Sequence, residues 1–142
     1  MTPTRRTLQM LRKQGATVAV VEKFNPGARV RQDLFGCIDI VALEPGQSGV
    51  LGIQATTTSN MAARRHKIAL EPRAALWMAC GNRLQIIGWA KRGPRGKRKV
   101  WQASVENVAD GIPAGARGGA PRGAAGRATA QNASEAQSQE RA

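Results

Sequence analysis

The sequence predicts an α/β domain over residues 1–105, with a mixed central sheet flanked by helices, and a disordered tail over residues 106–142. Three observations support this fold class. Short runs rich in Val and Ile alternate with Pro- and Gly-containing turns, which is typical of strands. Apolar residues at helical spacing occur before these runs and again between them. From residue 109 onward, 17 of 34 residues are Ala or Gly, too few large apolar side chains to form a core.

The elements are expected in the order helix, three strands, helix, strand and edge strand. Segments with Pro and Gly at residues 25–27 and 44–49 end the first and second strands. Ser59 or Asn60 is expected to cap the second helix, which Pro72 kinks or restarts. The expected helices cover residues 4–14 and 60–80, and the expected strands cover residues 16–24, 37–43, 50–56, 83–90 and 100–105.

The second helix is expected to be amphipathic. Met61, Ile68 and Leu70 are predicted to face inward, and the cations at positions 64, 65 and 67 to face outward. The core is then built from Val, Ile, Leu and Ala together with three tryptophans, which suffices for about 100 residues.

Positive charge is concentrated in the front part of the chain. Residues 1–102 hold 18 Lys and Arg against 5 Asp and Glu, a net charge of +13, whereas residues 103–142 hold 4 of each sign. A small body with this excess attracts polyanions, so nucleic acid is the expected partner. From charge alone, a ribosomal or nucleoid-type packing protein is an equally good interpretation.

Other features exclude several classes of protein. No run of 18 apolar residues predicts a membrane span, and no apolar run follows Arg5 and Arg6 as in a signal peptide. Cys37 and Cys80 lack CxxC spacing and are expected to be buried thiols in a reducing cytoplasm. With His66 as the single histidine, zinc binding and nuclease chemistry based on paired imidazoles are disfavoured.

One carboxylate falls inside an apolar strand. Asp39 lies in the run Cys-Ile-Asp-Ile-Val-Ala-Leu, where an ionised side chain is costly unless it is paired or binds a cation. The hairpin formed with the next strand is expected to bring Gln54 beside Asp39, with Thr56 further along the same face. The alternative for Asp39 is an ion pair with Arg29 or Arg31.

These residues resemble the PD-(D/E)XK nuclease superfamily, which includes restriction endonucleases and Holliday-junction resolvases. An acid on one strand, a polar residue about fifteen positions later and another two further on form the skeleton of that motif, and its αβββαβ element order matches residues 4–90. On this resemblance, Asp39 takes the place of the metal-binding aspartate, Gln54 that of the second acid and Thr56 that of the lysine. Glu22 matches the extra glutamate of resolvase-like members.

The resemblance implies a site for Mg²⁺ or Mn²⁺ and an endonuclease activity on DNA. Asp39, with Glu22 or Asp33 and the carbonyl oxygen of Gln54, would hold one or two ions, which activate water and stabilise charge. Because Thr56 cannot replace the lysine, we expect the positive side chain to come from the following helix. Lys67 is the first candidate and Arg65 the second. Each of the other residues also has a structural alternative. Asp33 could form a turn or a helix cap, Gln54 a cross-strand hydrogen bond and Glu22 an ion pair.

A second constellation consists of basic side chains expected to contact phosphates, which position a duplex without reading its sequence. Six cations fall within nine residues at an expected hairpin tip, and others follow the candidate site on a helix. The nucleic-acid-binding candidates are Arg64, Arg65, Lys91, Arg92, Arg95, Lys97, Arg98 and Lys99.

Three functions therefore follow as hypotheses. The first is a metal-dependent endonuclease acting on DNA, including branched or otherwise structured DNA. The second is a nucleic-acid-binding module that kept the fold and lost the chemistry, as the neutral Gln54 and Thr56 indicate. The third is a basic RNA- or ribosome-associated protein. Relatives of this size also dimerise, so a homodimer is an expectation of the resemblance, and Ala, Arg and Gly richness indicates a GC-rich bacterial or phage genome.

Overall fold

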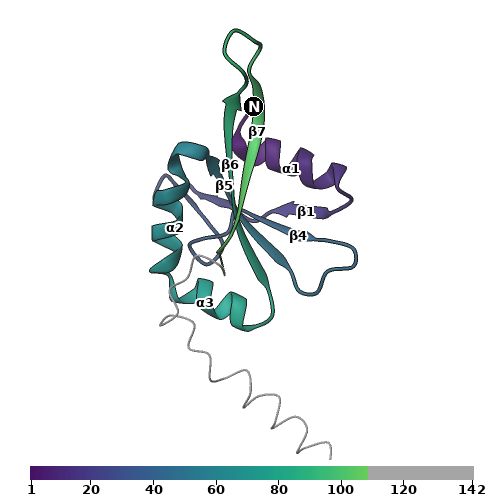
Figure 1. The fold of residues 1–142 in the computed structure, drawn as a ribbon. Helices are drawn as coiled ribbons and strands as arrows, with labels where there is room; N and C mark the ends of the chain where they lie inside the picture. Colours follow the sequence, from purple (N-terminus) through teal and green to yellow (C-terminus); the bar gives the residue numbers. More distant parts are fainter. Residues whose placement is uncertain (109–142) are drawn as a thin grey trace, which may run out of the picture. The chain divides into compact units, whose positions relative to one another are not determined.

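The computed structural model describes residues 1–108, so the part of the expected tail from residue 109 onward lies outside the described residues. The central sheet has five strands in the order β1-β4-β5-β6-β7 (Figure 1). Strands β5 and β6 are parallel, and the other neighbouring pairs are antiparallel. The expected α/β fold with a mixed sheet is confirmed. The elements are α1 (Pro3–Lys13), β1 (Thr17–Val20), β2 (Lys23–Asn25), β3 (Val30–Gln32), β4 (Ile40–Leu43), β5 (Leu51–Thr57), the short 3-10 helix η1 (Thr58–Asn60), α2 (Met61–Ala69), α3 (Pro72–Ala79), β6 (Arg83–Arg92) and β7 (Val100–Asn107).

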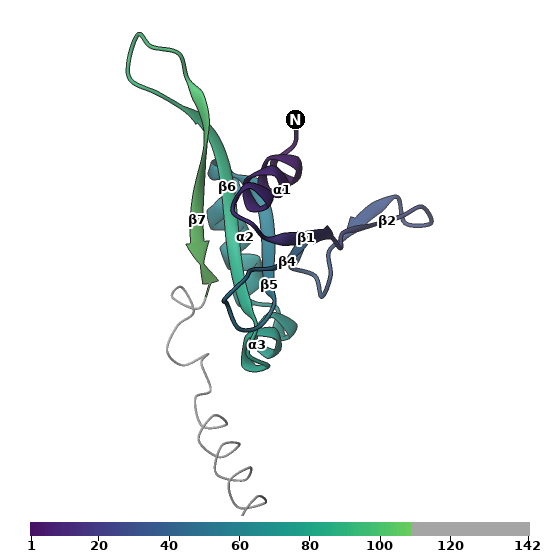
Figure 2. The ribbon, with the colours of Figure 1, turned by 90° about the vertical axis from the view of Figure 1, so that its right-hand side faces the viewer.

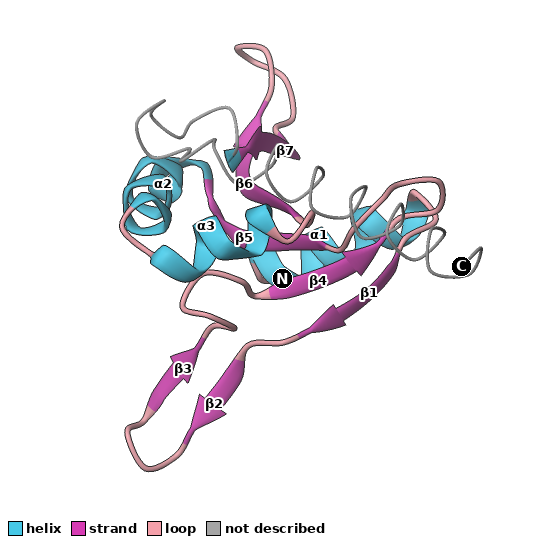
Figure 3. Ribbon diagram, turned by 90° about the horizontal axis from the view of Figure 1, so that it is seen from below, coloured by secondary structure: helices cyan, strands magenta, loops and turns pink. Residues whose placement is uncertain are grey.

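Helices cover both faces of this sheet because successive side chains of a strand point to opposite sides. Helix α1 places Leu11 in a core cluster with Ile53 and Ile87 on one face. On the other face, Gly52 makes room for Trp77 of α3, and Gly88 lies against Met61 of α2. Each small residue lets a helix approach the sheet closely. Figure 3 shows the sheet between these two layers.

Helix α1 is fixed to the sheet by a buried polar contact as well as by apolar packing. The indole nitrogen of Trp89 donates a hydrogen bond to the hydroxyl of Thr7 at 2.9 Å, and both side chains are buried. The N-terminal end of α1 is capped by Thr2, whose hydroxyl accepts from the backbone amide of Arg5. The contact with Trp89 therefore sets where the start of α1 lies relative to the strands.

The first strand differs from its prediction. It ends at Val20, because the amides of Val21 and Glu22 both donate to the carbonyl oxygen of Asp39, at 2.9 and 3.3 Å. Two successive donors on one acceptor end the regular ladder, and the chain bends away from the sheet. Residues 23–32 then form a separate two-stranded sheet, β2–β3, which was not predicted.

Several smaller expectations are also settled. Met61 and Ile68 are buried as predicted, whereas Leu70 is 71% exposed because α2 ends at Ala69 and α3 restarts at Pro72. Cys37 is a buried free thiol, but Cys80 is exposed at the end of α3. Strand β7 continues to Asn107, two residues beyond the expected strand end. Within residues 1–108, no helix combines the length and the apolar character that a bilayer span requires.

Candidate functional site

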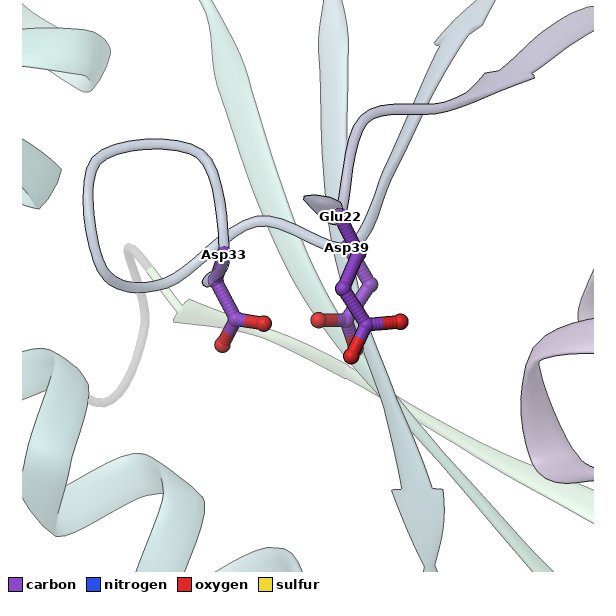
Figure 4. Close-up of side chains that lie close together, drawn as sticks. All are labelled: Glu22, Asp33 and Asp39. Carbon is purple, nitrogen blue, oxygen red and sulfur yellow. The ribbon is translucent and has the colours of Figure 1, made fainter. Parts of the chain in front are cut away.

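Three carboxylates meet where β1, β3 and β4 come together (Figure 4). Glu22 lies in the bend after β1, Asp33 directly follows β3, and Asp39 directly precedes β4. One oxygen atom from each side chain lies within 4.8 Å of the others. The three acids predicted as metal ligands are thus brought together, although Glu22 reaches the cluster from a bend and not from within a strand.

Gln54 joins this cluster through Asp39. Its side-chain nitrogen donates a hydrogen bond of 2.7 Å to Oδ2 of Asp39, and the backbone amide of Ala55 donates to the same oxygen at 3.0 Å. Since Ile40 pairs with Ile53, the next position of the ladder sets Asp39 opposite Gln54, as the sequence predicted. The other amide atom, Oε1 of Gln54, is buried and has no hydrogen-bond partner among residues 1–108.

The carboxylates, Gln54 and nearby cations line one open cavity of about 420 Å³. Three cations reach it from two elements, Arg31 from β3 and Arg64 and Lys67 from α2. The start of α1 closes another side, through Thr2, Pro3 and Thr4. The cavity therefore combines a group of carboxylates that suits a cation with positive side chains that suit an anion.

Thr56, Lys67 and Arg65 were considered for the place of the motif's lysine, and the three lie in different surroundings. Thr56 is buried on β5 opposite Gly88 and does not line the cavity. Lys67 does line it, and its Nζ lies 3.7 Å from Oδ2 of Asp33. Arg65, the reserve candidate, instead binds Glu106 of β7 through two hydrogen bonds of 2.6 and 2.8 Å.

The surroundings of Asp39 disfavour its charged form. Its pKa is raised from 3.8 to about 8, first because burial disfavours the charged form, and then because of a hydrogen bond with Asp33 and the negative charge of that side chain. The Ala55 amide opposes this shift, and the charge of Glu22 adds to it. Without a cation, this raised pKa favours the protonated form of Asp39 at neutral pH.

The remaining carboxylates among residues 1–108 have ordinary structural partners. Glu44, Glu71 and Glu106 bind arginines at 2.6, 2.8 and 2.6 Å. In the cluster the ion pairs are looser: Arg31 lies 3.7 Å from Glu22, and within the described chain no cation lies within 4.0 Å of Asp39. The alternative in which Asp39 pairs with Arg29 or Arg31 is therefore wrong. The ion pairs of the cluster are therefore longer than those of the other three carboxylates.

The predicted basic segment lies on a long hairpin that extends beyond the sheet (Figures 1 and 2). All of residues 91–99 are exposed, and the loop between β6 and β7 holds four of the six cations: Arg95, Lys97, Arg98 and Lys99. At its base, the guanidinium of Arg6 stacks 3.9 Å from the ring centroid of Trp101, and Nζ of Lys91 lies 5.6 Å from the same ring. The contact with Arg6 ties the hairpin to α1, whereas that with Lys91 lies within the hairpin between paired strands.

Sequence reasoning did not find two parts of this site. The start of α1 lines the cavity, but Thr2 and Pro3 signal a helix cap and nothing about a site. The β2–β3 hairpin has strands of only three residues each, too short for a periodic pattern to be recognised. Pro26 and Gly27 marked its turn, although not the strand that returns from it.

Comparison of the chain with protein-family models, with curated proteins and with solved structures finds no match.

Proposed function

We propose that this protein is an endonuclease of the PD-(D/E)XK type that uses Mg²⁺ or Mn²⁺ to hydrolyse phosphodiester bonds in DNA. The observation that supports it most is the convergence of Glu22, Asp33 and Asp39 in one cavity of a body with a large positive charge. Half of the carboxylates between residues 1 and 108 are gathered there, and burial together with the neighbouring acids raises the pKa of Asp39 to about 8. Such an arrangement is stable once a cation is bound.

The residues present suit a hard divalent cation. Carboxylate oxygens are the ligands that Mg²⁺ and Mn²⁺ prefer, and Oε1 of Gln54 is a buried oxygen that has no hydrogen-bond donor within the described residues. The buried thiol of Cys37 has its pKa raised to about 11, chiefly by burial, so it stays protonated and is a poor metal ligand. The donor set is therefore one of oxygen atoms, with Asp39 at its centre.

Each side of the cavity has a separate role in this proposal. The three carboxylates hold the cation, which when bound supplies an activated water and stabilises negative charge. Arg64 and Lys67 bring a phosphate group against the acids, and Lys67 offers the positive charge that Thr56 cannot. Gln54 orients the Asp39 carboxylate through its hydrogen bond, and its own side-chain oxygen is buried without a hydrogen-bond donor among the described residues.

The order of elements supports the same proposal. A helix precedes β1, β4 and β5, helices follow, and β6 then joins the sheet beside β5, which gives the αβββαβ order around the acids. The exposed cations of the β6–β7 loop suit phosphate contacts outside the cavity. Together they favour a duplex or branched DNA as substrate over a small phosphate ester.

A second candidate function is a binding module without catalysis. The specific observation in its favour is that the neutral amide of Gln54 occupies the position of an acid and donates to Asp39. A site with one charge fewer binds Mg²⁺ less tightly. In this alternative the basic hairpin still binds DNA, and the acids serve only to shape the cavity.

Cleavage of supercoiled plasmid and of a synthetic four-way DNA junction separates the two functions. Wild type is compared with Asp39→Asn, and with Glu106→Gln as a control that removes a carboxylate outside the cluster. Nicking or resolution that needs Mg²⁺ or Mn²⁺, is lost in Asp39→Asn and persists in Glu106→Gln supports the nuclease. DNA binding by all three proteins with no cleavage by any of them overturns it and leaves the binding module.

A further inference from the structure

A second hairpin extends from the body at the acid cluster. Strands β2 and β3 form a two-stranded sheet of their own, which points away from the central sheet (Figures 2 and 3). Lys23 pairs with Gln32 at its base, so the residues just outside it are Glu22 before β2 and Asp33 after β3. This β2–β3 arm, residues 23–32, therefore begins and ends at two of the three carboxylates of the candidate site.

The arm carries an exposed aromatic ring that does not pack in the hydrophobic core. Phe24 is 62% exposed and lies opposite Arg31, and Val30 is 49% exposed. A short isolated hairpin of this kind gains little from its own packing, and an exposed Phe on it contributes nothing to a core. Both observations indicate a surface that is completed by a partner.

The charge of the arm indicates which class of molecule that partner belongs to. Its charged residues are Lys23, Arg29 and Arg31, and no acid occurs between residues 23 and 32. A second copy of this chain would bring like charges together, because the body is itself strongly basic. Nucleic acid supplies the opposite charge for the cations and flat bases for the ring.

We propose that the β2–β3 arm binds DNA at a branch point or another unpaired position, with Phe24 stacked on a base that has left its helical stack. In an intact duplex the faces of the bases are covered by their neighbours, so an aromatic ring finds a stacking partner only where pairing is interrupted. Phe24 lies two residues beyond Glu22, so the chain separates their Cα atoms by at most roughly 7 Å. The stacked base is then close to the phosphate that the acid cluster addresses.

This inference rests on the proposed function of the same site, and it names the substrate as branched or otherwise interrupted DNA. It also assigns the two hairpins different tasks. The β6–β7 hairpin contacts phosphates along a duplex, whereas the β2–β3 arm recognises the interruption itself. Affinity for the duplex and preference for the branch are thus expected to depend on different residues.

Photo-crosslinking tests the inference directly. Phe24 is replaced by p-benzoylphenylalanine, and the protein is irradiated in EDTA with a four-way junction or with a linear duplex of the same sequence. Leu76 on α3 is also 62% exposed and receives the same replacement as a matched control. The expected result is a protein–DNA adduct at the branch from position 24, several times more abundant than with linear duplex, and none above background from position 76.

The other outcomes overturn the inference. A protein–protein adduct from position 24 identifies a second copy as the partner, and equal yields from positions 24 and 76 show that the arm has no special contact. As a second measurement, Phe24→Ala is expected to lower affinity for the junction roughly tenfold and to leave affinity for linear duplex unchanged. An equal loss for both DNAs, or no loss, contradicts the proposal.

Because these measurements are made in EDTA, they do not depend on catalysis. If crosslinking succeeds and no metal-dependent cleavage exists, the arm binds DNA and the nuclease proposal fails alone. If cleavage exists and position 24 gives no adduct, the nuclease proposal stands and the arm proposal fails.

Discussion

Gln54 donates a hydrogen bond of 2.7 Å from its side-chain nitrogen to Oδ2 of Asp39, which joins β5 to the residue that precedes β4. The same oxygen accepts from the backbone amide of Ala55, so two donors hold one carboxylate oxygen in place. The opposite side of that carboxylate meets Asp33 and Glu22. Asp39 is thus held by two neutral donors and lies close to two other acids.

The stability of the cation-free protein is expected to fall as the pH rises from about 4 to about 8. In the folded state the pKa of Asp39 is raised to about 8, chiefly by burial, whereas its ordinary value is 3.8. Between these values the folded state binds the extra proton, so each step up in pH favours the unfolded chain. The expected loss from pH 5 to pH 8 is on the order of 3 kcal/mol in the free energy of unfolding.

Urea unfolding in EDTA at pH 5 and pH 8 measures this loss, with Asp39→Asn as the control that cannot titrate at this position. The wild-type free energy of unfolding should decrease more than that of the variant. Identical pH profiles for the two proteins would show that Asp39 does not hold a proton in the folded state.

Gln54→Glu is expected to tighten Mn²⁺ binding about tenfold and to destabilise the cation-free protein. The substitution replaces a donor by a fourth carboxylate beside Asp39, so repulsion grows without a cation and attraction grows with one. Calorimetric titration with Mn²⁺ and thermal unfolding in EDTA measure the two effects. Gln102→Glu on β7, an exposed position outside the cavity, adds the same charge as a control. Unchanged Mn²⁺ affinity in Gln54→Glu would place the ion away from Gln54.

Lys67→Met is expected to separate cation binding from catalysis. Removal of the ammonium group 3.7 Å from Asp33 strengthens the negative potential of the cluster, so Mn²⁺ affinity should rise a few-fold. The rate constant of cleavage should fall about a hundredfold, because the developing negative charge loses its positive partner. Arg64→Met is the comparison, since Arg64 lines the same cavity but forms no ion pair with the cluster. An equal effect of both substitutions on both quantities would argue against a specific role for Lys67.

The loop of the β6–β7 hairpin is expected to carry much of the salt-dependent affinity for DNA. Lys97→Gln with Arg98→Gln should weaken duplex binding and reduce the slope of log K against log salt by about 1.8, because each phosphate that is no longer neutralised lowers the slope by about 0.9. Arg12→Gln with Lys13→Gln removes the same charge from the exposed end of α1, far along the helix from the cavity. Fluorescence anisotropy at several salt concentrations measures both double variants. Equal slopes would mean that net charge, and not the hairpin, determines affinity.

The sequence predicted the parts of the site that depend on regular pairing. Asp39 and Gln54 lie opposite each other because a hairpin fixes its register through its turn, and both strands have clear apolar patterns. Lys67 was expected near the acids from the resemblance to the nuclease superfamily, in which the lysine can lie on the following helix, and α2 does follow β5 after η1.

The sequence could not show where regular pairing stops. The bend after Val20 arises because two amides share the carbonyl oxygen of Asp39, a contact that no periodic pattern records. Arg65 was the second choice after Lys67, and no sequence pattern showed that Glu106 of β7 would lie 2.6 Å from its guanidinium. The raised pKa of Asp39 depends on burial and on three segments meeting, so it too is visible only in three dimensions.

The β2–β3 arm is a contiguous stretch of ten residues whose removal interrupts neither the pairing of β1 with β4 nor that of β4 with β5. The turn between its strands can thus vary as long as Glu22, Arg31 and Asp33 keep their places at the cavity. Under the proposed role of the arm, exchange of this one short segment would change the target and leave the core and the acids as they are. The same property makes residues 23–32 the natural place at which to graft another recognition loop.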